Sequence, residues 1–124
     1  MRSELPRVLV IDDEPGLCRA LARMLDRYLV DTCTDAIDAL DRISTIDYVA
    51  IVCDIGLPRV SGLELYKLAI VERPNVERRF ILMSGSAGDE ALRGFPSARV
   101  LLKPFDRAEL NAAIQAIVTG EARN

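Results

Sequence analysis

Histidine is absent from this sequence of 124 residues, and only three cysteines are present. A chain without histidine has no Ser-His-Asp triad, no histidine general base and no histidine-liganded zinc. The cysteines, Cys18, Cys33 and Cys53, have no CxxC spacing and lie in apolar or helical surroundings. This arrangement favours buried free thiols over a disulfide or a metal site. These features exclude many classes of enzyme at once.

Long apolar runs and an excess of positive charge are also missing. No apolar run approaches the roughly 18 residues that span a bilayer, and residues 1–8 contain no segment typical of a signal peptide. We therefore expect a cytoplasmic protein without membrane insertion. The net charge of −3 and the pI near 5.0 indicate no basic face for DNA or RNA, so we expect no direct nucleic-acid binding.

The residues that are present indicate one globular domain over residues 1–124, because half are apolar and 28% are charged. Short β-type runs occur at five places: 7–11, 28–32, 48–53, 79–83 and 99–103. Three of these runs are almost continuously apolar, which is typical of strands covered on both faces.

Helical patterns separate these runs. The first begins at Pro15 and reaches Tyr28, with three arginines on its polar side; the second follows Thr34 as N-cap, and the third spans 61–72. A weak two-turn pattern covers 88–94, and the last helix follows Asp106 as N-cap and stops at Gly120. Alternating strands and helices predict an α/β fold with a doubly wound, five-stranded parallel sheet.

Polar residues follow four of the predicted strands, at the edge where such folds bind ligands. The first strand is followed by Asp12 and Asp13, the third by Asp54, the fourth by Ser84 and the fifth by Lys103. Clustered carboxylates suit Mg²⁺, and an amine and a hydroxyl suit phosphoryl oxygens. Taken singly, each residue fits a cap, a turn or a solvated surface, but their coincidence at one edge favours a site.

Four motifs resemble those of the receiver domains of two-component response regulators, especially the single-domain chemotaxis and cell-cycle types. They are VLVIDDEP, VCDIGLPRVSG, ILMSG and LLKPF, in the order of that family and spread over essentially the whole chain. The resemblance implies a flavodoxin-like sheet with the strand order 2-1-3-4-5. It also implies a cis peptide bond before Pro104, which would aim Lys103 inward.

The same resemblance implies a role for each site residue. Asp54 would be the phosphoacceptor, and Ser84 and Lys103 would each contact a phosphoryl oxygen. The implied Mg²⁺ ligands are Asp12, Asp13, Asp54 and the backbone carbonyl of Gly56. The phosphoryl donor would be a sensor histidine kinase or a histidine phosphotransfer protein. We expect a signalling domain that is no enzyme in the usual sense, although it assists its own phosphorylation and dephosphorylation and switches binding to a downstream protein target.

The sequence departs from the family pattern in one region. Val100 stands where many receivers carry an aromatic switch residue, so rotation of a ring cannot operate here. The stretch from Ser84 to Lys103 is also about three residues shorter than is typical. Together with the weak pattern over 88–94, this predicts a fourth helix that is short, mobile or differently angled.

Other functions fit less well. A pseudo-receiver that binds partners without phosphorylation is disfavoured by the intact acids. Haloacid-dehalogenase-type phosphatases need a second acid two residues after the nucleophile, where this chain has Gly56. A flavodoxin-like cofactor site is disfavoured because the loop DDEPG is acidic. The motif LLKPF is compatible both with a stand-alone protein and with a receiver from a longer hybrid kinase.

Overall fold

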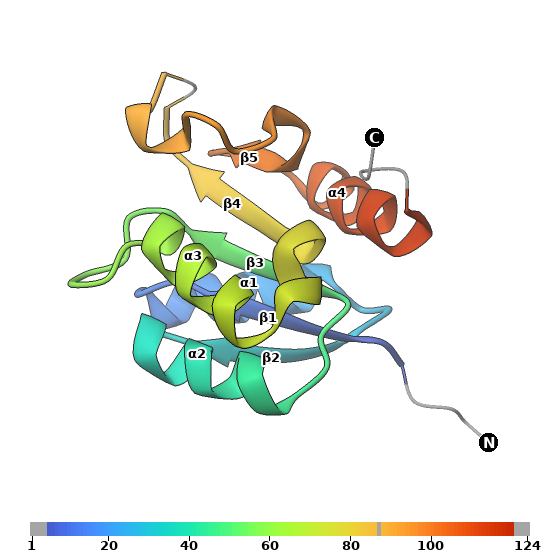
Figure 1. Ribbon diagram of the computed structural model, residues 1–124. Coiled ribbons are helices and arrows are strands. Elements are labelled where there is room, and N and C mark those ends of the chain that lie inside the picture. Colours follow the sequence, from blue (N-terminus) through green and yellow to red (C-terminus); the bar gives the residue numbers. More distant parts are fainter. Residues whose placement is uncertain (1–4, 87, 121–124) are drawn as a thin grey trace.

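Five parallel strands form one sheet in the order β2-β1-β3-β4-β5 (Figure 1), as predicted. The computed structural model describes residues 5–86 and 88–120. The expectation of no signal peptide rests partly on residues 1–4, which lie outside the described residues.

The strands lie within two residues of the predicted runs. They are β1 (Arg7–Ile11), β2 (Leu29–Cys33), β3 (Ala50–Asp54), β4 (Phe80–Ser84) and β5 (Val100–Leu102). Every residue of β3 and β4 is buried. This burial explains the continuous apolar runs, because a central parallel strand is covered by helices on both faces.

Within residues 5–86 and 88–120, four α-helices connect and cover the strands. They are α1 (Pro15–Met24), α2 (Ala36–Thr45), α3 (Gly62–Glu72) and α4 (Arg107–Thr119). Capping boxes begin α3 at Ser61 and α4 at Asp106, and Gly120 ends α4 with a left-handed φ of 85°.

Two helix boundaries differ from the prediction. The first helix ends at Met24 instead of reaching Tyr28, whose N–H donates to the carbonyl of Leu25 in a separate turn. The N-cap of α2 is Asp35 and not Thr34, because the Asp35 carboxylate accepts the N–H of Asp38 at 2.8 Å.

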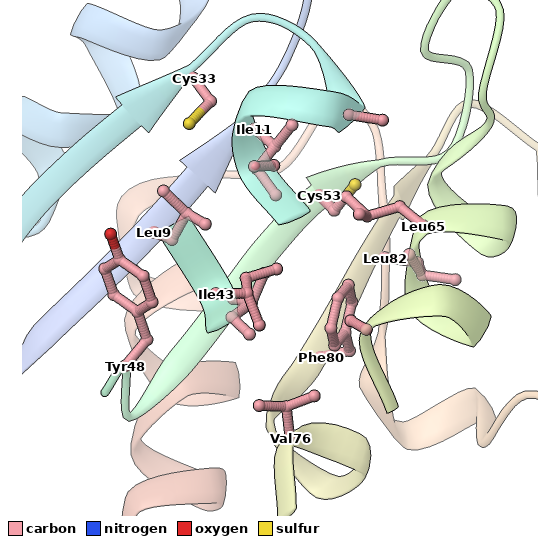
Figure 2. Packing of buried hydrophobic residues seen from close by; sticks show 14 of the residues in the cluster. Leu9, Ile11, Cys33, Ile43, Tyr48, Cys53, Leu65, Val76, Phe80 and Leu82 are labelled. Atoms are coloured by element: carbon pink, nitrogen blue, oxygen red, sulfur yellow. The ribbon is translucent and has the colours of Figure 1, made fainter. Parts of the chain in front are cut away.

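Alternate side chains of each central strand enter two apolar cores. In β1, Leu9 and Ile11 pack with α2 and α3, whereas Val8 and Val10 pack with α1 and α4 on the opposite face. Figure 2 shows the first of these cores, in which Ile43 of α2 lies over the strands beside Phe80. The two helical layers cover both faces of the sheet and leave its carboxyl edge open to loops.

The connection from β4 to β5 is irregular, as predicted, and the two-turn helix expected over 88–94 is not formed. In its described part, the segment contains two 3₁₀ turns, η2 (Glu90–Leu92) and η3 (Ser97–Arg99), and Gly94 has a left-handed φ of 86° between them. A further 3₁₀ helix that the sequence did not predict, η1 (Pro74–Arg79), precedes β4.

Two buried side chains fix this connection to α3 and η1. The ring of Phe95 packs edge-on against Tyr66 of α3, with the centroids 5.1 Å apart. The guanidinium of Arg99 lies 5.1 Å from the centroid of the Phe95 ring and donates to the carbonyl of Glu77 at 2.6 Å. These contacts take the place of the packing that a regular helix would supply.

Candidate functional site

The register of the sheet brings the predicted acids together. Ile11 pairs with Cys53 across β1 and β3, so Asp12 and Asp54 are at the same level on neighbouring strands. One carboxylate oxygen from each of Asp12, Asp13 and Asp54 lies within 4.8 Å of the others. The three acids therefore form one cluster at the carboxyl edge, as the sequence predicts.

Asp12 is the most deeply buried acid of the cluster, with 1% of its surface exposed. Its Oδ1 accepts the N–H of Glu14 at 3.0 Å, whereas its Oδ2 has no hydrogen-bond partner. Burial raises the pKa of Asp12, and the negative charge of Asp54 adds to this effect. A buried carboxylate oxygen without a partner is costly, and a bound cation would satisfy it.

Lys103 supplies the positive charge of the cluster. Its Nζ donates to Asp54 Oδ1 at 2.8 Å and lies 3.6 Å from Asp12 Oδ2, which is too far for a hydrogen bond. Burial opposes the charged form, but the hydrogen bond and the charge of Asp54 outweigh it and raise the pKa of Lys103. The Lys103–Pro104 peptide is cis, as the resemblance implied.

Ser84 ends β4 beside this cluster and is fully buried. Its backbone carbonyl accepts the N–H of Lys103 at 2.8 Å, which fixes the two residues side by side. Its hydroxyl donates to the carbonyl of Ser86 at 3.0 Å and accepts the N–H of Ser86 at 3.1 Å. The hydroxyl therefore bonds within its own loop in this state.

Two glycines shape the loop that follows Asp54. A Cβ added at Gly56 would lie 3.5 Å from Asp54 Oδ2, so residue 56 adjoins the carboxylate. A Cβ added at Gly62 would clash with the backbone carbonyl oxygen of Asp54 and lie 2.9 Å from Ile55 Cα. Gly62 thus lets the start of α3 pack directly on the end of β3.

Sequence reasoning missed Gly62 and Cys18 as contributors to the site, and it missed the bond that Ser86 makes to Ser84. One signal in the sequence pointed to Gly62: it is a glycine in the first turn of a predicted helix, although glycine has a low helix propensity. Ser86 and Cys18 gave none: Ser86 holds the Ser84 hydroxyl, and the Cys18 thiol donates to the carbonyl of Asp12 at 3.3 Å. Such contacts depend on the local path of the backbone.

The donor set matches a hard divalent cation. Carboxylate oxygens are the ligands that Mg²⁺ prefers, and the Asp12 oxygen without a partner would gain most from a bound ion. Carboxylates this close repel each other, and Lys103 alone offsets only one of three negative charges. The site is therefore built to hold further positive charge.

Comparison with known proteins identifies relatives of this chain. Residues 8–115 match the family model described as response regulator receiver domain. The cell cycle response regulator CtrA of Brucella ovis is 32% identical over 117 residues, which is 90% of this chain and 50% of the relative. This chain thus spans about half the length of the curated relatives it matches.

Solved structures show the same fold. A CheY-like receiver domain protein from Methanospirillum hungatei superposes with a TM-score of 0.83 at 24% identity, covering 97% of this chain and 98% of the other. The chemotaxis response regulator CheY4 of Vibrio cholerae has a TM-score of 0.80 at 19% identity, covering 91% and 98%. Among the residues described here, no helix combines the length and apolar character needed to cross a membrane.

Proposed function

Because the chain belongs to the response regulator receiver domain family of two-component signalling, we propose that Asp54 accepts a phosphoryl group from a phosphohistidine. The donor would be a sensor histidine kinase or a histidine phosphotransfer protein in the cytoplasm. The observation that carries the proposal is the 2.8 Å contact between Lys103 Nζ and Asp54 Oδ1, inside the cluster of three acids.

The proposed cofactor is Mg²⁺. Its ligands would be Asp12, Asp13, Asp54 and the backbone carbonyl of Gly56, and when bound it would neutralise phosphoryl oxygens in the transition state. The buried Oδ2 atom of Asp12, which has no hydrogen-bond partner, supports this assignment.

In the proposed transfer, a carboxylate oxygen of Asp54 attacks phosphorus in line with the bond to the donor imidazole. The new P–O bond forms as the P–N bond breaks, and the imidazole nitrogen leaves with the electron pair. Lys103 already contacts the Asp54 carboxylate. After the transfer, its ammonium group would pair with a negatively charged phosphoryl oxygen. Transfer of the phosphoryl group to water would restore Asp54.

Ser84 would link phosphorylation to a change in shape. Its hydroxyl donates to the carbonyl of Ser86 in this structure, so donation to a phosphoryl oxygen would break that hydrogen bond and allow the turn to open. The opening would shift the β4–β5 connection and alter the surface offered to a downstream protein target. Val100 has no ring to rotate, so the movement would arise in the backbone of this connection.

The test is incubation with Mg²⁺ and acetyl phosphate, followed by intact mass measurement. We expect one phosphoryl group on the wild type, none on Asp54→Ala, and one on the control Asp41→Ala, which changes an exposed acid on α2. No adduct on the wild type, or an undiminished adduct on Asp54→Ala, refutes the proposal. Steady phosphate release from many esters would instead favour a phosphatase.

A further inference from the structure

The thiol of Cys18 joins three elements beside the acidic cluster. Cys18 lies near the start of α1 and is 2% exposed. Its Sγ donates to the carbonyl of Asp12, the residue after β1, at 3.3 Å. The same sulfur lies 3.7 Å from the carbonyl of Cys33, the last residue of β2. One buried side chain of α1 thus contacts the carboxyl ends of two neighbouring strands.

Hydrogen bonds hold Asp12 at three of its atoms. Its N–H donates to the carbonyl of Cys33 at 3.1 Å, and its own carbonyl accepts the Cys18 thiol. Its Oδ1 accepts the N–H of Glu14 at 3.0 Å, and its buried Oδ2 has no hydrogen-bond partner among the described residues. Because the carbonyl and the carboxylate belong to one residue, a shift of the Asp12 backbone would also move Oδ2. The thiol therefore helps to fix where this oxygen lies.

Packing alone does not account for the direction of the thiol. A buried cysteine behaves as a small apolar side chain, and Cys18 does lie in a core with Leu21. Hydroxyl side chains in helices often bond the carbonyl four residues earlier. For Cys18 that carbonyl belongs to Glu14, and it already accepts the N–H groups of Leu17 and Cys18 at 3.0 and 3.1 Å. The thiol instead bonds Asp12, which lies outside the helix.

We propose that Cys18 is a positioning residue for the Mg²⁺ site: its thiol holds the carbonyl of Asp12 and so keeps Oδ2 where a cation can bind. This inference rests on the proposed function and adds a residue of α1 to the support of its metal site. Removing a group that orients a metal ligand typically weakens metal binding by roughly 10- to 100-fold. A thiol is a weak donor, so we expect a smaller effect, about fivefold.

Cys18 acts through the backbone of Asp12 and is not proposed as a ligand. Among the described residues, the group of donor atoms within 4.8 Å of one another comes from Asp12, Asp13 and Asp54 and does not include the Cys18 sulfur. Oxygen ligands are also those that Mg²⁺ prefers. Loss of the thiol should therefore change the affinity for Mg²⁺ without changing which residues bind it.

The test is a Mg²⁺ titration followed by the NMR shift of the Glu14 amide, which bonds Asp12 Oδ1 and so responds to an ion at that carboxylate. Cys18→Ala removes the donor, and Cys18→Val removes it while keeping more of the side-chain volume. We expect both to weaken Mg²⁺ binding about fivefold. Cys18→Ser keeps a donor and should stay within about twofold of the wild type.

The rate of labelling by acetyl phosphate gives a second measurement. In Cys18→Ala and Cys18→Val, the Mg²⁺ concentration that gives half the maximal rate should rise by the same factor. The rate at saturating Mg²⁺ should stay unchanged, because the thiol does not touch the reacting atoms. A general loss of structure would lower that maximal rate as well.

Cys33→Ala is the matched control. It removes a thiol that is 3% exposed from the opposite core (Figure 2), and it keeps the backbone carbonyl that Asp12 contacts. Its Mg²⁺ affinity should equal that of the wild type. Wild-type affinity in Cys18→Val, or an equal loss in Cys18→Ser or Cys33→Ala, overturns the inference and leaves the proposed function standing. A wild type that binds no Mg²⁺ refutes the proposed cofactor and the inference with it.

Discussion

At the scale of single residues, Asp12 is a buried carboxylate with one oxygen that has no hydrogen-bond partner. Burial raises its pKa above the ordinary 3.8, so the folded chain binds the Asp12 proton more tightly than the unfolded chain does. This contribution to stability is therefore lost as pH rises from about 3.8 through the folded pKa.

The first prediction concerns Asp12→Asn. Because the variant removes a buried charge, we expect its free energy of unfolding at pH 7 without Mg²⁺ to exceed that of the wild type by about 1 kcal/mol. Added Mg²⁺ should stabilise the wild type and leave the variant almost unchanged. Urea titrations with and without Mg²⁺ measure both effects, with the exposed Asp41→Asn as control. Equal stabilisation of Asp12→Asn by Mg²⁺ would contradict the metal assignment.

Arg59 is a second unusual residue, because its φ is 67° in the loop after Asp54. A tight turn forces this angle: the N–H of Val60 donates to the carbonyl of Pro58 at 2.7 Å. A left-handed φ costs a residue with a side chain about 1–2 kcal/mol of conformational free energy. Glycine adopts this angle without strain, although it loses more backbone entropy on folding.

The second prediction is therefore that Arg59→Gly raises the free energy of unfolding by about 0.5–1 kcal/mol, measured by urea denaturation. Arg59→Lys keeps the charge and the angle and should show little change. A loss of stability in Arg59→Gly would show that the Arg59 side chain makes a contact worth more than the backbone strain.

At the scale of elements, the junction between β3 and α3 depends on Gly62. The N–H of Gly62 donates to the carbonyl of Ile55 at 3.0 Å, and no Cβ fits between the helix and the strand end.

The third prediction is that Gly62→Ala lowers the free energy of unfolding by about 1–3 kcal/mol and slows labelling of Asp54, because α3 must move away from that residue. Gly88→Ala, where a Cβ meets only a distant Ser86 hydroxyl, is the matched control. Wild-type labelling in Gly62→Ala would refute the coupling.

The β4–β5 connection depends on Phe95, which is 8% exposed in a segment that is otherwise mostly open. The fourth prediction is that Phe95→Ala costs about 2–4 kcal/mol of unfolding free energy, because it removes contacts with both Tyr66 and Arg99. Thermal unfolding measures the loss, and Leu102→Ala, on a side chain that is 46% exposed, should cost much less. Similar losses in the two variants would show that Phe95 is no anchor.

The elements differ in how far the sequence predicts them. Strands such as β3 are recognisable because burial on both faces requires continuous apolar residues, and α4 because Asp106 and Gly120 mark its ends. The end of α1 is missed because the apolar spacing continues through Leu25 and Tyr28, which pack after the helix has stopped. The 3₁₀ turns near Phe95 are missed because tertiary contacts determine their shape.

At the scale of the whole molecule, the sheet assembles residues that are far apart in the chain. Lys103 and Asp54 are 49 positions apart and in contact, because β4 lies between β3 and β5 and each strand ends at the same edge. The site could be predicted to this extent, since carboxyl ends of parallel strands share one edge. The bond of Ser84 to Ser86 and the Asp12 oxygen without a hydrogen-bond partner could not be predicted, because both depend on atomic positions.

The central claim is that Asp54 receives the phosphoryl group, and locating that group tests it most directly. The chain is labelled with acetyl phosphate and Mg²⁺, the acyl phosphate is reduced with borohydride to a homoserine residue, and peptides are sequenced by mass spectrometry. The account predicts homoserine at position 54 and unchanged acids at positions 12 and 13. Homoserine at another acid, or none in a protein that is folded and bound to Mg²⁺, would contradict it.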